Sequence, residues 1–185
     1  RCPGGKSRIS PFLEHLIKSA GCQDGRYVEP YAGGAGAALS LLFREVVASI
    51  QINDASPAIH AFWSSVVDAT DEFCDRIRSV PLTIDEWQRQ REILTRGAGN
   101  SVVEMGFAAF FLNRTNRSGI IRSGGVIGGL DQSGRWKLDA RFNREELVRR
   151  IKRIGLYRDR IDVSGLDALD LLAEPRHSDR TFFYL

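Results

Sequence analysis

The sequence predicts a mixed α/β fold of the doubly wound, Rossmann-like type, with a long helical and hairpin insertion. The first observation is that short apolar runs alternate with segments of helical periodicity over residues 26–70. The second is a glycine turn, Gly33 to Gly36, between the first predicted strand and the helix that follows it. The third is the final run "RTFFYL", which is typical of a strand buried on both faces of a parallel sheet.

The amino-terminal elements follow from apolar spacing and from turn residues. A helix is predicted over 9–20, and Gly21 can end it. Strands are predicted over 27–31 and 49–54, with a helix over 37–47 between them. Proline after the second strand suits the first turn of another helix. This order is the beginning of a doubly wound sheet.

The middle of the chain departs from that order. Residues 71–117 carry apolar side chains at helical spacing, whereas 118–143 is rich in glycine and is typical of a hairpin or a long loop. A basic helix is predicted over 144–154, and the strand "RIDVSG", a helix over 168–173 and the last strand then resume the sheet. We therefore predict an α/β domain and an inserted region, with the bounds 1–70 plus 155–185 and 71–154.

Composition is that of an ordinary globular protein of 185 residues, 43% of them hydrophobic. Charge is uneven, because residues 113–160 carry 13 basic and 5 acidic side chains, against 11 and 13 over residues 1–112. A basic segment of this kind is either a solvated helix face or a phosphate-binding surface. No apolar run approaches the roughly 20 residues of a membrane span, so we expect a cytoplasmic protein without a membrane partner.

The cysteines and histidines give no sign of a disulfide framework or a metal site. Three cysteines form no CxxC pair, and three histidines lie far apart without matching ligand spacing. We therefore expect reduced, structural cysteines and no metal.

The first predicted strand contains an acidic residue near its end, and the second ends on one. A glycine turn at a helix N-terminus presents free amides to a ligand, and Glu29 lies just before that turn. Asp54 follows the glycines by about 20 residues, where an acid binds ribose hydroxyls in such folds. Capping of the next helix is an alternative role for Asp54, compatible with the first. The GxGxxG fingerprint is absent, which counts against a nicotinamide-dependent oxidoreductase.

Six stretches of the sequence resemble DNA adenine methyltransferases of the Dam type, the alpha group. They are "EPYAGGAGAAL", "INDASPAI", "CPGGKSRI", "FFLNRTNRSGI", "WKLDARFN" and "VSGLDALDLL". The resemblance spans nearly the whole chain. It implies a Rossmann-like sheet that binds S-adenosylmethionine and an inserted target-recognition region that binds double-stranded DNA. The implied reaction transfers a methyl group from S-adenosylmethionine to the exocyclic amine of adenine.

The resemblance also implies a methyl-donor site. Its expected residues are Lys6, Glu29, Tyr31, Gly33, Gly34, Asp54 and Asp167. Lys6 and the two glycines would meet the methionine end of the donor, and Asp54 the ribose. Asp167 would lie beside the cofactor's adenine, with capping of the following helix as the alternative. Cys2 and Ala35 depart from the family pattern, which has Trp and often Gly at these positions.

A second set of side chains is expected to contact DNA: Asn113, Arg114, Asn116, Arg117, Arg122, Lys137 and Arg150. Arg and Asn pair bidentately with guanine and adenine edges, and Arg122 is the best candidate for such a contact. The basic helix behind them suits phosphates. Asn113 and Arg114 have a structural alternative, in which they bond the helix end and the hairpin. Arg117 stands where some relatives carry an aromatic that wedges into the base stack.

Catalysis in this family uses an Asp-Pro-Pro-Tyr loop that follows an apolar strand of the type "FFYL". The 185 residues contain no such motif, so the resemblance implies that the motif lies directly after Leu185 and that this chain lacks the catalytic loop. A noncatalytic DNA-binding or regulatory module that keeps the fold is the alternative. We expect a monomer, and a restriction endonuclease of the same system is a candidate partner.

Overall fold

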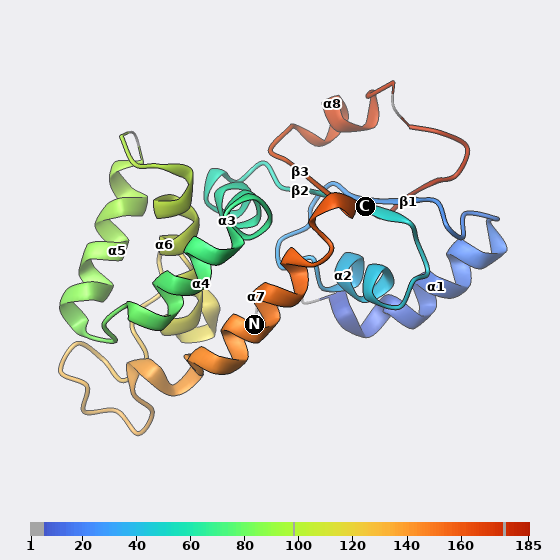
Figure 1. Cartoon of the computed structure of the whole chain (residues 1–185). Coiled ribbons are helices and arrows are strands. Elements are labelled where there is room, and N and C mark those ends of the chain that lie inside the picture. Colours follow the sequence, from blue (N-terminus) through green and yellow to red (C-terminus); the bar gives the residue numbers. More distant parts are fainter. Residues whose placement is uncertain (1–5, 98, 176) are drawn as a thin grey trace. The chain divides into compact units, whose positions relative to one another are not determined.

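The computed structural model describes residues 6–97, 99–175 and 177–185 (Figure 1). The strands are β1 Arg26–Glu29, β2 Ser49–Asn53, β3 Ile161–Ser164 and β4 Thr181–Phe183. The α-helices are α1 Ser10–Ser19, α2 Gly36–Phe43, α3 Pro57–Asp68, α4 Thr70–Ser79, α5 Ile84–Arg96, α6 Val102–Thr115, α7 Arg144–Gly155 and α8 Ala168–Leu172. Short 3-10 helices are η1 Lys6–Ile9, η2 Arg117–Gly119, η3 Leu138–Arg141 and η4 Arg158–Arg160.

The chain divides into two compact units. We call one the sheet unit; it runs up to His60 and resumes over Tyr157–Leu185. The other, the helical unit, covers Ala61–Leu156. Helix α3 begins in the sheet unit, and its residues from Ala61 onward belong to the helical unit. Within the described ranges, no helix is both long and apolar enough to cross a membrane.

The sheet unit contains a parallel sheet with strand order β3-β2-β1-β4. This confirms the predicted mixed α/β, Rossmann-like fold. Tyr27, Ile50 and Ile52 are buried on one face, since Tyr27 pairs with Ile50 and strand side chains alternate. Helix α2 packs against β1 and β2 and buries Leu41 and Leu42. Burial of these side chains supplies the hydrophobic stabilisation of the sheet unit.

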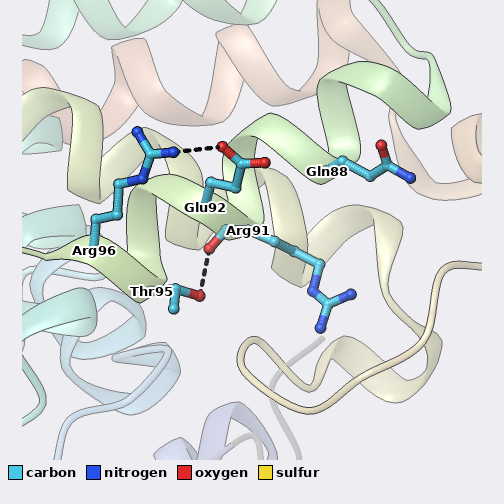
Figure 2. A pocket seen from close by; sticks show the side chains of 5 residues that line it. All are labelled: Gln88, Arg91, Glu92, Thr95 and Arg96. Carbon is cyan, nitrogen blue, oxygen red and sulfur yellow. Dashed lines mark hydrogen bonds and ion pairs between the residues drawn. The ribbon is translucent and has the colours of Figure 1, made fainter.

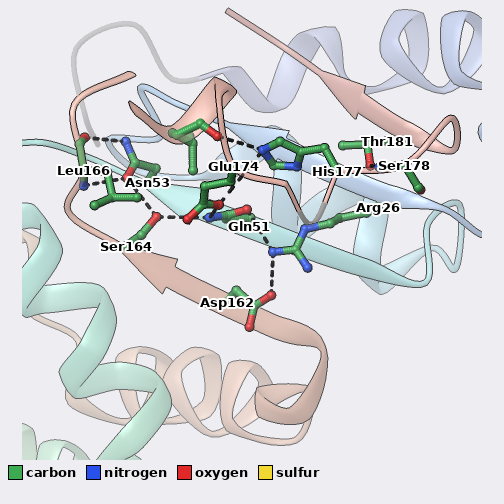
Figure 3. Close-up of polar contacts among 11 residues, drawn as sticks. Arg26, Gln51, Asn53, Asp162, Ser164, Leu166, Glu174, His177, Ser178 and Thr181 are labelled. Carbon is green, nitrogen blue, oxygen red and sulfur yellow. Dashed lines mark hydrogen bonds and ion pairs between the residues drawn. The ribbon is translucent and has the colours of Figure 1, made fainter. Parts of the chain in front are cut away.

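The other face of the sheet is polar, which is unusual for a parallel sheet. Arg26 donates to the side-chain amide oxygen of Gln51, Oε1, at 2.8 Å, and its guanidinium pairs with the Asp162 carboxylate at 2.6 Å. Gln51 is fully buried, and its amide nitrogen lies 3.3 Å from a Glu174 oxygen (Figure 3). His177 extends this group, with Nε2 at 2.7 Å from the Leu171 carbonyl oxygen. Hydrogen bonds therefore attach α8 and the segment after it to the sheet.

Helix α2 is shorter than the predicted 37–47 helix, because the chain turns sharply at Glu45. That residue has a positive φ of 55°. The N–H groups of Glu45 and Val46 donate to the carbonyls of Leu42 and Leu41, both at 3.0 Å, which closes the helix end. The turn brings Val46 into the core and leads directly into β2.

The helical unit is held together by aromatic side chains and by well-capped helices. Ring contacts link a cluster of Phe62, Phe73, Phe107, Phe110, Phe111 and Phe142. Ser101 and Glu104 form a reciprocal capping box at the start of α6. Arg144 donates to the Val80 carbonyl at 2.6 Å and to the Ile77 carbonyl, so the first residue of the basic helix α7 caps the end of α4.

Residues 118–143 form no regular hairpin, so of the two structures that the sequence predicts here, a hairpin or a long loop, the chain has the long loop. Around this segment the described chain has one β-pairing, an isolated antiparallel bridge between Asn116 and Val126. Gly128 and Gly129 have φ of 89° and 82°, which breaks an extended strand at that point. Gln132 then donates to the carbonyls of Ile127 and Gly129, at 2.8 and 2.6 Å. Side-chain bonds to the main chain thus replace a strand ladder here.

Candidate functional site

The carboxyl ends of β1, β2 and β3 meet at one edge of the sheet, where ligands bind in open α/β sheets. Asn53, the last residue of β2, is fully buried at this edge. Its Nδ2 donates to the carbonyls of Pro30 at 2.9 Å and Leu166 at 3.0 Å. Its Oδ1 accepts from Ser164 Oγ at 2.8 Å and from Leu166 N at 2.9 Å (Figure 3). One amide therefore joins the ends of three strands.

Asp54 follows Asn53 and connects the glycine turn to the end of β2. Its Oδ2 accepts from the N–H of Gly33 at 2.9 Å, and its Oδ1 accepts from Ser56 N at 3.0 Å. Both oxygens keep acceptor capacity, since a carboxylate oxygen has two lone-pair directions. Gly33 has φ of 51° and Ala35, which precedes α2, has φ of 44°. The turn is thus held by the acid that the sequence assigns to ribose.

The other expected donor-site residues lie at the same edge. Glu29 ends β1 and is fully buried, whereas Tyr31 is 59% exposed in the turn after it. Burial raises the pKa of the neighbouring Tyr27 phenol far above its usual range, and the Glu29 carboxylate contributes to that rise. Asp167 caps α8, with its carboxylate accepting from Leu169 N at 2.8 Å.

One expected contact and one departure from the family pattern fall outside what the structure describes. Lys6 begins η1, and its side chain is not among those described. Cys2, with the rest of the first five residues, lies outside the described ranges. Asp54, Glu29, Gly33 and the neighbouring turn, together with Asp167, are therefore the expected donor-site residues that the structure describes.

The helical unit carries the residues expected to contact DNA, and Asn116 differs from the others. It is fully buried. Its Oδ1 accepts from Trp87 Nε1 at 2.6 Å, and its Nδ2 donates to the carbonyls of Ile120 at 2.7 Å and Ile121 at 3.2 Å. In this structure Asn116 has no surface for a base edge, because its hydrogen-bonding groups face the interior.

Asn113 and Arg114 lie at the end of α6 and are half-buried. Asn113 Nδ2 donates to the Gly119 carbonyl at 3.0 Å, and the Arg114 guanidinium lies 5.8 Å from the Phe110 ring centroid. Arg141 donates to the carbonyls of Asn113, at 3.0 Å, and Asn116, and burial lowers the pKa of its guanidinium. These contacts support the helix end and the following loop, as the structural alternative for Asn113 expects.

The remaining expected DNA contacts are exposed: Arg117, Arg122, Lys137 and Arg150. Lys137 donates to the Gln132 carbonyl, and Arg150 Nε lies 2.6 Å from Glu146 Oε1. Arg149 also binds Glu146, and these two guanidinium groups lower the pKa of its carboxyl. Part of the basic charge of α7 is therefore neutralised within the helix.

An open hollow of about 310 Å³ lies on the exposed side of α5 (Figure 2). It is lined by Gln88, Arg91, Glu92, Thr95 and Arg96. Arg96 pairs with Glu92 at 3.2 Å, and the Arg91 guanidinium lies 4.7 Å from the Trp87 ring centroid. The hollow contains none of the predicted site residues. Within the described ranges, no three His, Cys, Asp or Glu side chains gather to hold a metal ion.

Sequence reasoning missed Asn53, Trp87 and Arg141, which organise the two groups of site residues. Asn53 directly precedes Asp54, and an amide at the end of a buried strand is a signal that could have identified it. No local pattern marks Trp87 or Arg141, because their partners lie 25 to 29 residues away.

A parallel sheet whose strand ends carry a glycine turn and two acids is a Rossmann-like arrangement, consistent with the methyltransferase class. The chain belongs to the family of D12 class N6 adenine-specific DNA methyltransferases, whose model matches residues 3–185. This confirms the predicted enzyme class. A search of curated proteins found no match.

Proposed function

We propose that this chain is the donor-binding and DNA-recognition part of a Dam-type, alpha-group methyltransferase that methylates the exocyclic amine of adenine in DNA. The observation that carries the proposal is the pair of bonds by which Asp54 holds the Gly33 turn at the carboxyl edge of the sheet. The family match supports adenine in DNA as the substrate class.

The residues at the sheet edge fit S-adenosylmethionine. Asp54 and Asp167 offer carboxylate oxygens to the hydroxyl and amino groups of the nucleoside part of the donor. A Cβ added at Gly33 would meet no atom within 4 Å, so the turn opens onto free space there. Glu29, Tyr31, Gly34 and Lys6 complete the proposed site. When bound, the donor supplies a methyl group activated by its sulfonium.

DNA binding is assigned to exposed basic side chains of the helical unit. Arg122 and Arg117 lie on the loop after α6 and are proposed to reach the base edges, and Lys137 is a further proposed DNA contact. Arg150 on α7 is proposed to contact phosphates. Asn113, Arg114 and Asn116 support this loop from within, through the contacts described above. The target base has to leave the duplex before its amine can react.

Methyl transfer in the proposed enzyme class uses an Asp-Pro-Pro-Tyr loop. Its carboxylate and a main-chain carbonyl would accept the hydrogens of the amine, and its aromatic would stack on the flipped adenine. Strand β4 pairs in parallel with β1 over Arg26–Val28, so its carboxyl end lies at the proposed donor-site edge.

Calorimetry with S-adenosylmethionine tests the donor site. We expect binding to weaken at least about tenfold in Asp54→Ala, because the variant loses the ribose acceptor and the bond to Gly33. Asp68→Ala, an exposed acid at the end of α3, is the matched control and should bind as the unaltered chain does. Equal affinities for all three proteins would overturn the donor-site assignment. DNA binding without donor binding would favour the noncatalytic module instead.

A further inference from the structure

The loop over 117–125 is closed at its base by two main-chain hydrogen bonds. Arg117 N donates to the Gly125 carbonyl at 2.9 Å, and Ile127 N donates to the Thr115 carbonyl at 2.8 Å. The loop is packed tightly, since a Cβ added at Gly124 would lie 2.3 Å from the Ile120 carbonyl oxygen. It carries the exposed Arg122, to which base reading is assigned above.

The Asn116 amide occupies the inside of this loop. Its two donor bonds go to the carbonyls of Ile120 and Ile121, and Ile121 directly precedes Arg122. Its acceptor bond comes from Trp87 on α5. An indole N–H can only donate, so the amide oxygen has to face Trp87 and the NH₂ group has to face the loop. Trp87 therefore determines which way the Asn116 amide points.

We propose that Trp87 is a positioning residue for DNA recognition: through Asn116 it holds the backbone next to Arg122 and so sharpens the base preference of that arginine. This inference rests on the proposed function of the helical unit. Without the indole N–H, the Asn116 oxygen is a buried acceptor without its donor, and the amide loses the contact that orients it. The loop then holds Arg122 less firmly, and a bidentate contact with a base depends on such precision.

Trp87→Phe tests the inference, because it removes the N–H donor while keeping an aromatic ring in the core. The chain and the variant are each incubated with random double-stranded oligonucleotides, and the bound fraction is sequenced. We expect about tenfold weaker discrimination at one base pair, the one that Arg122→Ala also affects, with total binding to non-cognate DNA unchanged. In the double variant, Trp87→Phe should add nothing to the loss caused by Arg122→Ala.

Ser65→Ala is the stability-matched control. It removes a buried hydroxyl that donates to the Ala61 carbonyl at 2.6 Å, in the same unit but outside the loop. It should lower thermal stability without changing the selected motif. If Trp87→Phe fails to fold, benzothienylalanine at position 87 keeps the ring shape and removes only the N–H.

The possible outcomes separate this inference from the proposal beneath it. Loss of discrimination at the Arg122 position in Trp87→Phe supports the inference. An unchanged motif, or an equal loss in Ser65→Ala, overturns it and leaves the DNA-recognition role in place. If the unaltered chain selects no motif at all, the proposed recognition role is overturned and this inference with it.

Discussion

Asn53 in the sheet unit and Asn116 in the helical unit are both fully buried, and each uses both ends of its amide. They differ in the span of chain that they connect. The carbonyls bound by Asn53 belong to Pro30 and Leu166, 23 and 113 residues away. Asn116 binds carbonyls only 4 and 5 residues away, and Trp87 is its remote partner.

The difference shows two ways of building a site from main chain. At the sheet edge, strands from distant parts of the sequence must already be paired before Asn53 can bond them, so its contacts depend on the whole unit. In the loop after α6, Asn116 arranges its own neighbours, and a single bond to α5 orients it. Damage at Asn53 should therefore spread through the unit, whereas damage at Asn116 should stay local.

Asn53→Ala is the largest expected effect and tests that contrast directly. The variant leaves several buried groups around the strand ends without partners, so the free energy of unfolding should fall by roughly 3 kcal/mol. All four tyrosines lie in the sheet unit and all three tryptophans in the helical unit. Tyrosine absorbance should therefore show an earlier transition on urea denaturation, while tryptophan fluorescence changes less.

Two variants act as controls for Asn53→Ala. Ser164→Ala removes one of the four bonds and should cost about 1 kcal/mol. Asn116→Ala should leave the affinity for S-adenosylmethionine unchanged, whereas Asn53→Ala should weaken it, because Asp54 and the segment before Asp167 are attached to this amide. If Asn116→Ala weakened donor binding as much as Asn53→Ala, the contrast between the two amides would fail.

The next largest effect separates the loop from the helix within the helical unit. Arg122→Ala should cost about 1 to 3 kcal/mol at one base position, because a direct base contact is lost. Arg150→Ala should weaken binding to all sequences alike. It should also reduce the slope of log K against log salt concentration by the amount expected for about one phosphate contact. Binding is measured by fluorescence anisotropy on the selected DNA and on single-base variants, at several salt concentrations.

Arg89→Ala is the matched control for these arginines, since Arg89 is exposed on α5 and pairs with Glu86. It should change neither specificity nor the salt dependence. Uniform losses from both Arg122→Ala and Arg150→Ala would refute the division between base reading and phosphate binding.

Much of the fold could be predicted because its signals are local. Apolar spacing, Gly21 and the glycine turn were enough to predict α1, β1 and the start of α2. The extended helix over 37–47 was wrong, because a left-handed residue at Glu45 carries no sequence signal comparable with Gly. For residues 118–143 the glycines predicted a hairpin or a long loop and left the choice open, because side-chain bonds from Gln132 and Asn116 decide the course of this segment.

The position of a candidate site residue in the fold could be predicted where that residue directly follows a predicted strand. Asp54 at the end of a strand is such a residue, and its place at the sheet edge follows from the fold. Asn116 looked like a base reader, because Asn suits adenine, but its burial depends on Trp87 and could not be read locally. Arg144 likewise belongs to a basic helix, yet its guanidinium binds carbonyls 64 to 67 residues away.

The smallest expected effect extends the contrast between remote and local contacts to ion pairs. Arg160 joins Glu45 at 2.8 Å across 115 residues of sequence, and this bond lowers the pKa of the Glu45 carboxyl. Glu146 instead pairs with arginines of its own helix, which also lower its pKa. A carboxyl whose pKa is lowered on folding stabilises the fold above its unfolded pKa, and that contribution is lost as the pH falls through the folded value.

Glu45→Gln should therefore reduce the stability of the sheet unit slightly at pH 7, and the difference from the unaltered chain should vanish in acid, once the pH lies below the lowered pKa of the folded-state carboxyl. Added salt should shrink it further, because the pair is exposed. Arg160 keeps its bonds to the carbonyls of Ala48 and Val47, so the unit should stay folded.

Glu146→Gln should affect only the α7 end of the helical unit, since the partners of Glu146 are neighbours on the same helix. Urea denaturation of both variants at pH 7 and in acid, followed by tyrosine and tryptophan signals separately, measures this. A loss in the tyrosine transition that persisted unchanged in acid would show that Glu45 acts through packing and not through its charge.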